Sequence, residues 1–277
     1  MTSIHKPVSH KPVSALTIAG SDSSGGAGIQ ADLKTFHRLG VYGQSAVTLI
    51  TAQNTTGVMA VHVLPVRLVE QQIDAVLSDI GAAAIKTGAL GSATLIHAVA
   101  QRLRACPEIP LVVDPVLISK HGHLLVDVDA EPGAIVALRD QLMPLATVIT
   151  PNWFEAAALS CLPVTTPAQA LTAARWLLAH GARAVLLKGG GESDAGSSAT
   201  AHDILVEPTG DTVLPGMRVA TSNLHGSGCT FAAAITAYLA RGQPLAEAAS
   251  RAKAFIAQAI ATAPGLGRGR GPVNHWA

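Results

Sequence analysis

A run of small residues leads directly into an apolar, alanine-rich segment near the C-terminal end of the chain. The run is residues 223–230 (NLHGSGCT), and the segment is residues 231–239. We expect a helix to begin there, so that unsatisfied backbone N–H groups and the positive end of the helix dipole meet at one point, which suits a phosphate group. Cys229 lies in the expected first turn, where the same field favours its thiolate. An anion site beside a titratable side chain is what phosphoryl transfer to an alcohol requires, although a glycine-rich turn with Cys229 as a small core residue explains the pattern equally well.

Polar residues and glycines also follow several short apolar segments along the chain. These positions are Ser21-Asp22, Gln53-Asn54, Lys86-Thr87-Gly88, Asp114, Asn152 and Lys188-Gly189-Gly190. In a parallel sheet, ligands bind beyond the carboxyl ends of the strands. The residues therefore predict one rim of a binding cleft beside the anion site.

Strand and helix patterns alternate over most of the chain. Strands are expected at 16–19, 46–50, 58–64 (an edge strand), 83–86, 111–113, 147–149 and 184–187, with an antiparallel pair at 204–206 and 212–219. Helices are expected at 29–39, 66–80, 92–103, 135–142, 153–160, 167–180, 230–239 and 245–263. This alternation predicts an α/β fold, with a mostly parallel sheet covered by helices on both faces.

The chain is expected to form one domain behind a short tail. No long polar linker interrupts the alternation, which indicates a single domain over residues 15–277. Residues 1–14 contain the pentapeptide HKPVS twice in succession, too short a unit for a structural repeat. We interpret this segment as a mobile N-terminal tail and assign it no function.

Two nucleotide-binding motifs and a metal site are excluded by their missing residues. Gly26-Ala27-Gly28 opens a pattern like the dinucleotide fingerprint, but residues 51–54 (TAQN) hold no acid for a ribose. The run from Gly20 resembles a P-loop, yet Gly26-Ala27 occupies the place of its Lys and Ser/Thr. His121 and His123 form no metal-ligand pattern with other residues and are interpreted as loop surface.

Composition limits the partners and the compartment. The chain has 277 residues, of which 49% are hydrophobic, with 19 Lys and Arg against 18 Asp and Glu. This balance gives no electrostatic reason to expect nucleic acid or a membrane as partner. The three cysteines, Cys106, Cys161 and Cys229, are far apart and fit a reducing compartment. We expect a cytoplasmic protein that binds small molecules.

Taken together and in order, these motifs resemble the hydroxymethylpyrimidine and phosphomethylpyrimidine kinases of thiamine biosynthesis, which belong to the ribokinase-like superfamily. The resemblance covers nearly all of residues 15–275, and its motifs lie at 15–36, 52–55, 86–88, 114–116, 150–156, 187–190, 225–230 and 271–275. It implies a three-layer α/β/α sandwich that usually forms a homodimer.

The resemblance also implies roles for individual residues. Gly226 and Gly228 match the family's anion hole, and Cys229 matches its proposed base. The positions that match the surroundings of the pyrimidine are Gly20, Asp32, Gln53 and Val116. Those that match the ATP phosphates and magnesium are Asn152, Glu155 and Lys188, with Asp114 nearby and Glu155 and Asp114 as the expected Mg²⁺ ligands.

Three positions depart from the family pattern. Gly191 replaces a common His and Leu224 a common Thr, both on the nucleotide side. Ala89 replaces a common Met on the substrate side, where we expect a space beside the pyrimidine.

Gln53 indicates which substrate is bound. A primary amide accepts a hydrogen bond from an exocyclic amine and donates one to the adjacent ring nitrogen, a pair of groups that a 4-aminopyrimidine offers and pyridoxal does not. An ordinary amide that caps the backbone at a strand end is the alternative for this residue.

The sequence therefore predicts an ATP- and Mg²⁺-dependent kinase for 4-amino-5-hydroxymethyl-2-methylpyrimidine. The resemblance extends this activity to the monophosphate, which gives the diphosphate. A vitamin B6 kinase is the nearest alternative, and a non-catalytic pyrimidine-binding regulatory protein is an alternative of another class.

Overall fold

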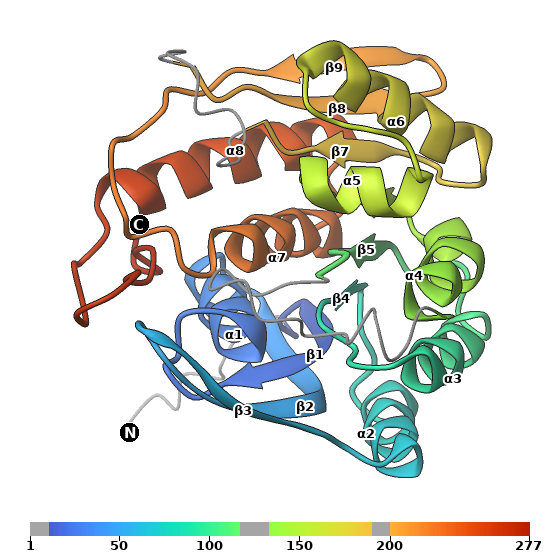
Figure 1. Cartoon of the computed structure of the whole chain (residues 1–277). Coiled ribbons are helices and arrows are strands. Elements are labelled where there is room, and N and C mark those ends of the chain that lie inside the picture. The colour runs from blue at the N-terminus through green and yellow to red at the C-terminus, as the bar shows by residue number, and fades with distance from the viewer. Residues whose placement is uncertain (1–10, 117–132, 190–199) are drawn as a thin grey trace, which may run out of the picture.

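A nine-stranded sheet forms the centre of the structure, in the order β3-β2-β1-β4-β5-β6-β7-β8-β9 (Figure 1). The structure is a computed structural model that describes residues 11–116, 133–189 and 200–277. Several positions discussed above lie outside the described residues: residues 1–10 of the expected tail, His121, His123, Gly190 and Gly191.

The middle of the sheet is parallel and its two edges are antiparallel. The strands are β1 (Ser14–Asp22), β2 (Tyr42–Asn54), β3 (Gly57–Val63), β4 (Ala84–Thr87), β5 (Leu111–Val113), β6 (Val148–Ile149), β7 (Val185–Leu187), β8 (Asp203–Glu207) and β9 (Gly210–Leu214). Neighbours from β2 across to β7 pair in parallel. β3 pairs antiparallel with β2 at one edge, and β8 and β9 pair antiparallel at the other.

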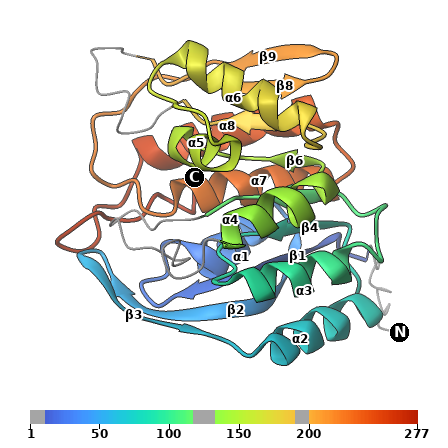
Figure 2. The ribbon, with the colours of Figure 1, turned by 45° about the vertical axis from the view of Figure 1, so that its right-hand side comes forward.

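Helices cover both faces of this sheet (Figure 2). They are α1 (Gly28–Arg38), α2 (Val66–Ser78), α3 (Ala93–Leu103), α4 (Gly133–Ala137), α5 (Trp153–Ser160), α6 (Pro167–Ala179), α7 (Ser227–Ala240) and α8 (Leu245–Ala261). One apolar core packs α2, α3, α4 and α6 against the sheet, and a second packs α1, α7 and α8 against its other face. The expected α/β sandwich with a mostly parallel sheet is confirmed.

The composition of each helix matches the layer that it occupies. α2 buries Val69 and Ile73, which are one turn apart on a single stripe, and leaves most of its other residues accessible. α7 is buried on most of its sides because it packs against both the sheet and α8. Its alanines let the backbones of these layers approach closely, which explains the alanine-rich sequence.

The expected elements are all present, but some boundaries differ. The segment expected as one helix over 135–142 is α4 followed by a π-helical turn, Leu138–Leu142. β9 ends at Leu214, so the expected strand over 212–219 is too long at its end. α7 begins at Ser227 and not at residue 230, because Gly226 takes the left-handed conformation before it (φ 76°). In the described part of the chain, no helix combines the length and apolar character that crossing a membrane requires.

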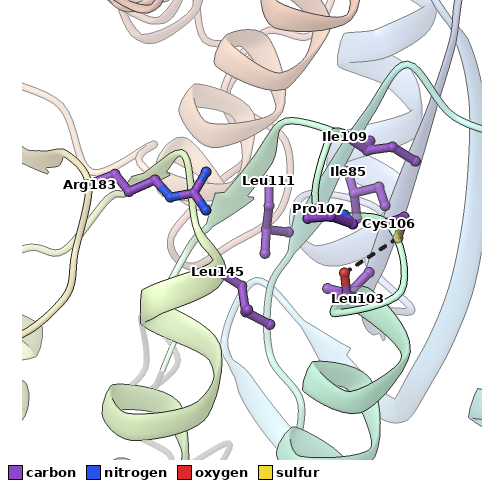
Figure 3. A pocket seen from close by; sticks show the side chains of 8 residues that line it. All are labelled: Ile85, Leu103, Cys106, Pro107, Ile109, Leu111, Leu145 and Arg183. Carbon is purple, nitrogen blue, oxygen red and sulfur yellow. Dashed lines mark hydrogen bonds between the residues drawn. The ribbon is translucent and has the colours of Figure 1, made fainter.

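A small apolar hollow lies near the amino ends of β4 and β5 and holds no site (Figure 3). Its volume is about 20 Å³, enough for about one water molecule. The Cys106 side chain beside it lies 3.5 Å from the carbonyl oxygen of Leu103. Burial raises the pKa of the Cys106 thiol, which disfavours the reactive thiolate.

Candidate active site

A cleft of about 560 Å³ opens at the carboxyl ends of the parallel strands. Its wall contains residues at the ends of β1, β2 and β4 and residues that follow β5, β6 and β7, together with the start of α7. The predicted site residues that line it are Gly20, Gln53, Ala89, Asp114, Val116, Asn152, Glu155, Lys188, Gly226, Gly228 and Cys229. The structure thus brings together eleven residues that the sequence distributes over more than 200 positions.

The start of α7 presents unsatisfied backbone donors to the cleft. The N–H of Thr230 bonds to the Gly226 carbonyl oxygen at 2.8 Å, and the N–H of Ser227 bonds to the Leu224 carbonyl oxygen at 3.1 Å. The N–H groups of Gly228 and Cys229 have no acceptor among the described residues. Two unsatisfied donors at the positive end of a helix, in the wall of a cleft, are suited to bind a phosphate.

A chain of charged groups lies beside these donors. Lys188 Nζ is 3.1 Å from Asp114 Oδ1 and 3.5 Å from Glu155 Oε2. A Cβ built on Gly228 would lie 3.5 Å from Lys188 Nζ, so the ammonium group is adjacent to the start of α7. Burial alone would raise the pKa of Asp114, but Lys188 and Lys86 hold it below its usual value, so the carboxylate is charged.

Asn152 and Glu155 fix the start of α5 as well as lining the cleft. Asn152 Oδ1 accepts a hydrogen bond from the Glu155 N–H at 2.9 Å, and Glu155 Oε2 accepts one from the Asn152 N–H at 2.7 Å. This reciprocal capping box explains the sequence pattern at the helix start. The Glu155 carboxylate therefore has a fixed position next to Lys188.

Asp32 is expected near the pyrimidine, but it is not among the residues that line the cleft. Its side chain is fully buried beneath the cleft floor. Its Oδ2 accepts hydrogen bonds from Lys86 Nζ at 3.0 Å and from the Thr17 hydroxyl at 2.6 Å. Asp32 therefore acts on the cleft through Lys86, a residue that lines it although its accessible surface is nearly zero.

The Cys229 thiol is protonated in this site, contrary to the expectation that its helix position favours the thiolate. Burial raises the pKa of the Cys229 thiol to about 12. The Lys86 ammonium lowers this pKa, but Asp114 and Asp32 raise it again, and a hydrogen bond from the Gly28 N–H lowers it. The loss of solvent outweighs the groups that favour the thiolate.

The loop after β1 is organised around Asp22. Its Oδ1 accepts hydrogen bonds from the Ser24 N–H and hydroxyl at 2.8 and 2.7 Å, and its Oδ2 accepts from the N–H groups of Gly26 and Ala27 at 3.1 and 2.8 Å. His225 Nε2 lies 2.7 Å from the same Oδ2. This contact joins the loop to the residue that precedes Gly226 at the start of α7.

Lys86 was expected on the rim as part of Lys86-Thr87-Gly88, but His225, Asp203 and Lys253 were not predicted as members of the cleft wall. Lys253 pairs with Asp203 at 2.7 Å, and the other oxygen of Asp203 accepts from the Gly189 N–H at 2.8 Å. The signal that placed Lys86 on the rim was its position directly after an apolar strand run. Burial of such a residue is rare unless it is paired.

The layered fold and the anion site at the start of α7, flanked by Lys188 and Asp114, define the class of ribokinase-like small-molecule kinases. The family model described as phosphomethylpyrimidine kinase matches residues 22–274. The chain belongs to this family.

Three relatives illustrate the similarity. The hydroxymethylpyrimidine/phosphomethylpyrimidine kinase of Haemophilus influenzae is 45% identical over 95% of this chain and 96% of its own length. The thiamine biosynthesis bifunctional protein ThiED of Geobacter sulfurreducens is 49% identical over 95% of this chain, which spans 52% of that longer protein. The solved pyridoxal kinase of Staphylococcus aureus, in complex with ADP, is 41% identical with a TM-score of 0.86, over 95% of this chain and 93% of its own.

Proposed function

We propose that this protein transfers the γ-phosphoryl group of ATP to the hydroxymethyl group of 4-amino-5-hydroxymethyl-2-methylpyrimidine, a step of thiamine biosynthesis. The observation that carries this proposal is the pair of unsatisfied N–H groups at the start of α7, in one cleft with Lys188, Asp114 and Gln53. The names of the curated relatives support the same reaction class. The further transfer to the monophosphate, which gives the diphosphate, is proposed on the same basis.

The transfer depends mainly on alignment and charge. The alcohol oxygen forms a new bond to the γ-phosphorus while the bond to the bridging oxygen of ADP breaks, and the transition state is loose. The N–H groups of Gly228 and Cys229, together with Lys188, stabilise the charge on the transferring group. The hydroxyl proton passes to Cys229, which accepts it only in the thiolate form.

The residues present fit a Mg²⁺ ion bound mainly through phosphates. Asp114 Oδ1 bonds to Lys188 and Thr150, while its Oδ2 faces the start of α7, 4.0 Å from a Cβ built on Gly228. Among the described residues, no group of three or more His, Cys, Asp or Glu is arranged to hold a metal. Mg²⁺ in kinases needs only one or two carboxylates besides phosphates and water, and we propose Asp114 and Glu155 for this role. When bound, the ion supplies positive charge to the phosphate oxygens.

A vitamin B6 kinase is the alternative, because one of the similar solved structures is a pyridoxal kinase. The curated relatives named for pyrimidine substrates favour the aminopyrimidine. A non-catalytic regulatory role is disfavoured, since the donors and charged groups that a transfer requires all line one cleft.

One assay tests the proposal. ATP consumption is measured in parallel with the aminopyrimidine, its monophosphate and pyridoxal, and each product is identified by mass. We expect phosphorylation of the first two, dependent on Mg²⁺ and lost on chelation. Faster turnover of pyridoxal than of the aminopyrimidine would reject the proposed substrate in favour of vitamin B6.

The assembly and the compartment are part of the proposal. The edge strand β3 exposes the apolar side chains of Met59, Val61 and Val63. An exposed apolar edge favours pairing with another chain, which supports the expected homodimer. The cytoplasm remains the expected compartment, as predicted from the widely spaced cysteines.

A further inference from the structure

His225 Nε2 lies between the side chains of Asp22 and Gln53. It is 2.7 Å from Asp22 Oδ2 and 3.2 Å from the side-chain nitrogen of Gln53. All three residues are buried, and all three line the cleft. Because little water reaches this cluster, its members must satisfy one another's hydrogen bonds.

The proton in the short contact belongs to His225. Burial alone would raise the pKa of Asp22, but hydrogen bonds from His225 and Ser24 lower it to about 2, so the side chain is a carboxylate. A carboxylate accepts hydrogen bonds and donates none. His225 Nε2 therefore carries a hydrogen and points it at Asp22, whether the ring is neutral or charged.

The hydrogen on His225 Nε2 determines the orientation of the Gln53 amide group. The amide nitrogen and the N–H of His225 are both donors and do not bond to each other. A half-turn about the last side-chain bond exchanges the amide nitrogen with its oxygen, which accepts the single Nε2 hydrogen jointly with Asp22 Oδ2 in a three-centre bond. The oxygen is thus held on the His225 side, and the NH₂ group is held on the other.

His225 is itself held in place by the backbone around it. Its N–H donates to the Gly271 carbonyl oxygen at 3.0 Å, and its carbonyl oxygen accepts from the Val273 N–H at 3.2 Å. A Cβ built on Gly26 would lie 3.2 Å from Nε2, and closer to the ring carbon Cδ2, so the ring packs directly on that glycine. A ring confined in this way cannot turn to present another atom to Gln53.

A locked amide distinguishes two pyrimidines that a free amide would not. A 4-aminopyrimidine presents a donor next to an acceptor, its amine and ring nitrogen, whereas a 4-oxo pyrimidine presents a carbonyl acceptor next to an N–H donor. A free glutamine turns over to match either edge. An amide whose oxygen and nitrogen are held in fixed positions forms both hydrogen bonds with only one of these two edges.

We propose that Asp22 and His225 together determine specificity by fixing the polarity of the Gln53 amide, so that the site selects 4-amino over 4-oxo pyrimidines. This inference rests on the proposed function, since it takes Gln53 as the residue that faces the pyrimidine. His225 is a positioning residue, because it acts on the substrate through Gln53.

The test compares the kcat/KM of the 4-amino substrate with that of its 4-oxo analogue. His225→Phe keeps a ring but removes the donor, and we expect the amino-to-oxo ratio to fall about tenfold or more, as for the loss of one specific polar contact. His225→Gln keeps an N–H that Asp22 orients, and we expect it to retain most of the ratio. His275→Leu is the matched control, because this second buried histidine bonds to Thr230 and does not line the cleft.

A purely structural role for His225 predicts a different result. Both substrates would then lose kcat/KM by the same factor in His225→Phe, the ratio would not change, and the proposal would be overturned. Calorimetric binding of the two pyrimidines repeats the comparison without turnover. A wild-type protein that binds the aminopyrimidine selectively but does not phosphorylate it refutes the proposed function and leaves the inference standing.

A second measurement locates the hydrogen directly in the wild-type protein. Nitrogen NMR of wild-type protein with labelled histidine reports which ring nitrogen of His225 carries hydrogen, with the resonance assigned by its absence in His225→Gln. We expect a protonated Nε2. A ring protonated on Nδ1 alone would remove the reason for the fixed amide and overturn the proposal.

Discussion

Cys229 combines a position suited to catalysis with an environment that keeps its thiol protonated. It lies in the first turn of α7, where its N–H has no acceptor among the described residues. The nearby carboxylates of Asp114 and Asp32 oppose a thiolate, and the Lys86 ammonium favours one. The thiolate needed to accept the substrate proton is therefore a minor species near neutral pH.

The first prediction concerns turnover of Cys229→Ala. We expect kcat to fall about 100-fold or more, in the range of general-base contributions, while ATP affinity stays near the wild-type value. Steady-state kinetics and nucleotide titration measure the two quantities. Wild-type turnover in the variant would show that the anion site and solvent suffice.

The pH dependence of the same reaction supplies a control. The thiolate fraction rises with pH below a thiol pKa of about 12. The kcat of the wild type should therefore rise by up to about tenfold per pH unit between roughly pH 7 and 9, and that of Cys229→Ala should be nearly flat. Parallel profiles would argue against the thiol as proton acceptor.

The second prediction concerns substrate choice by Gln53. Gln53→Leu should weaken use of the aminopyrimidine by about 1–3 kcal/mol in kcat/KM, because polar groups of the ligand lose their partner. Any side activity on pyridoxal should fall less. Gln44→Leu is a matched control on the same strand, since Gln44 is buried, bonds to the Gly81 carbonyl oxygen and does not line the cleft. Equal losses on both substrates would mean that Gln53 only shapes the pocket.

The start of α7 depends on close contact with another element. Gly226 has a left-handed φ of 76°, and a Cβ there would overlap the Gly26 carbonyl oxygen in the loop after β1. The two loops thus approach at a distance that only glycine permits. This contact sets where the free N–H groups of the helix point.

The third prediction compares two glycines with nearly equal backbone strain. Gly242, at the other end of α7, has a φ of 78° and open space around a built Cβ. Both Gly226→Ala and Gly242→Ala should lose roughly 1 kcal/mol or more of stability from strain. Only Gly226→Ala should also lower kcat, by about 100-fold, because it displaces the anion site. Chemical denaturation and kinetics measure both effects, and equal activity in the two variants would refute the assignment.

A buried ion pair connects three elements beneath the cleft. Lys86 on β4 and Thr17 on β1 both donate to Asp32 Oδ2 on α1, and Asp32 Oδ1 has no hydrogen-bond partner in the described structure. Each of these two buried charges is stabilised by the other, so removing one leaves its partner buried without a counter-ion.

The fourth prediction follows from this pair. Lys86→Met leaves the Asp32 carboxylate buried without its counter-ion and should reduce the free energy of unfolding by about 3–5 kcal/mol. The double variant Lys86→Met/Asp32→Leu should recover much of this loss, because no charge remains buried. Urea denaturation measures both. A double variant no more stable than the single one would show that the pair does not act as a unit.

At the scale of the whole molecule, the β3 edge of the sheet presents a row of exposed apolar side chains. Met59 on β3 is 68% exposed, and Val61 and Val63 beside it are also exposed. The edge strand lies next to β2, which carries Gln53 into the cleft. A dimer formed through β3 would therefore also stiffen the strand that carries Gln53.

The fifth prediction tests that assembly. We expect a dimer in light scattering of the purified protein, and Met59→Lys should shift it toward monomer because a charge is placed in the contact. Val136→Lys, on the exposed side of α4, is the control and should leave the mass unchanged. A monomeric wild type would exclude the dimer.

The sequence alone determined the layered α/β class, the order of the elements and eleven of the residues that line the cleft. Apolar periodicity is local, so it identified strands and helices from short windows, and polar residues at strand ends marked the rim. The tertiary structure decided the burial of Asp32, the protonation of Cys229 and the contact between Asp22 and His225, which are 203 positions apart. These properties depend on which groups exclude water from one another. Short-range patterns carry no record of such long-range contacts, and only the folded chain brings them about.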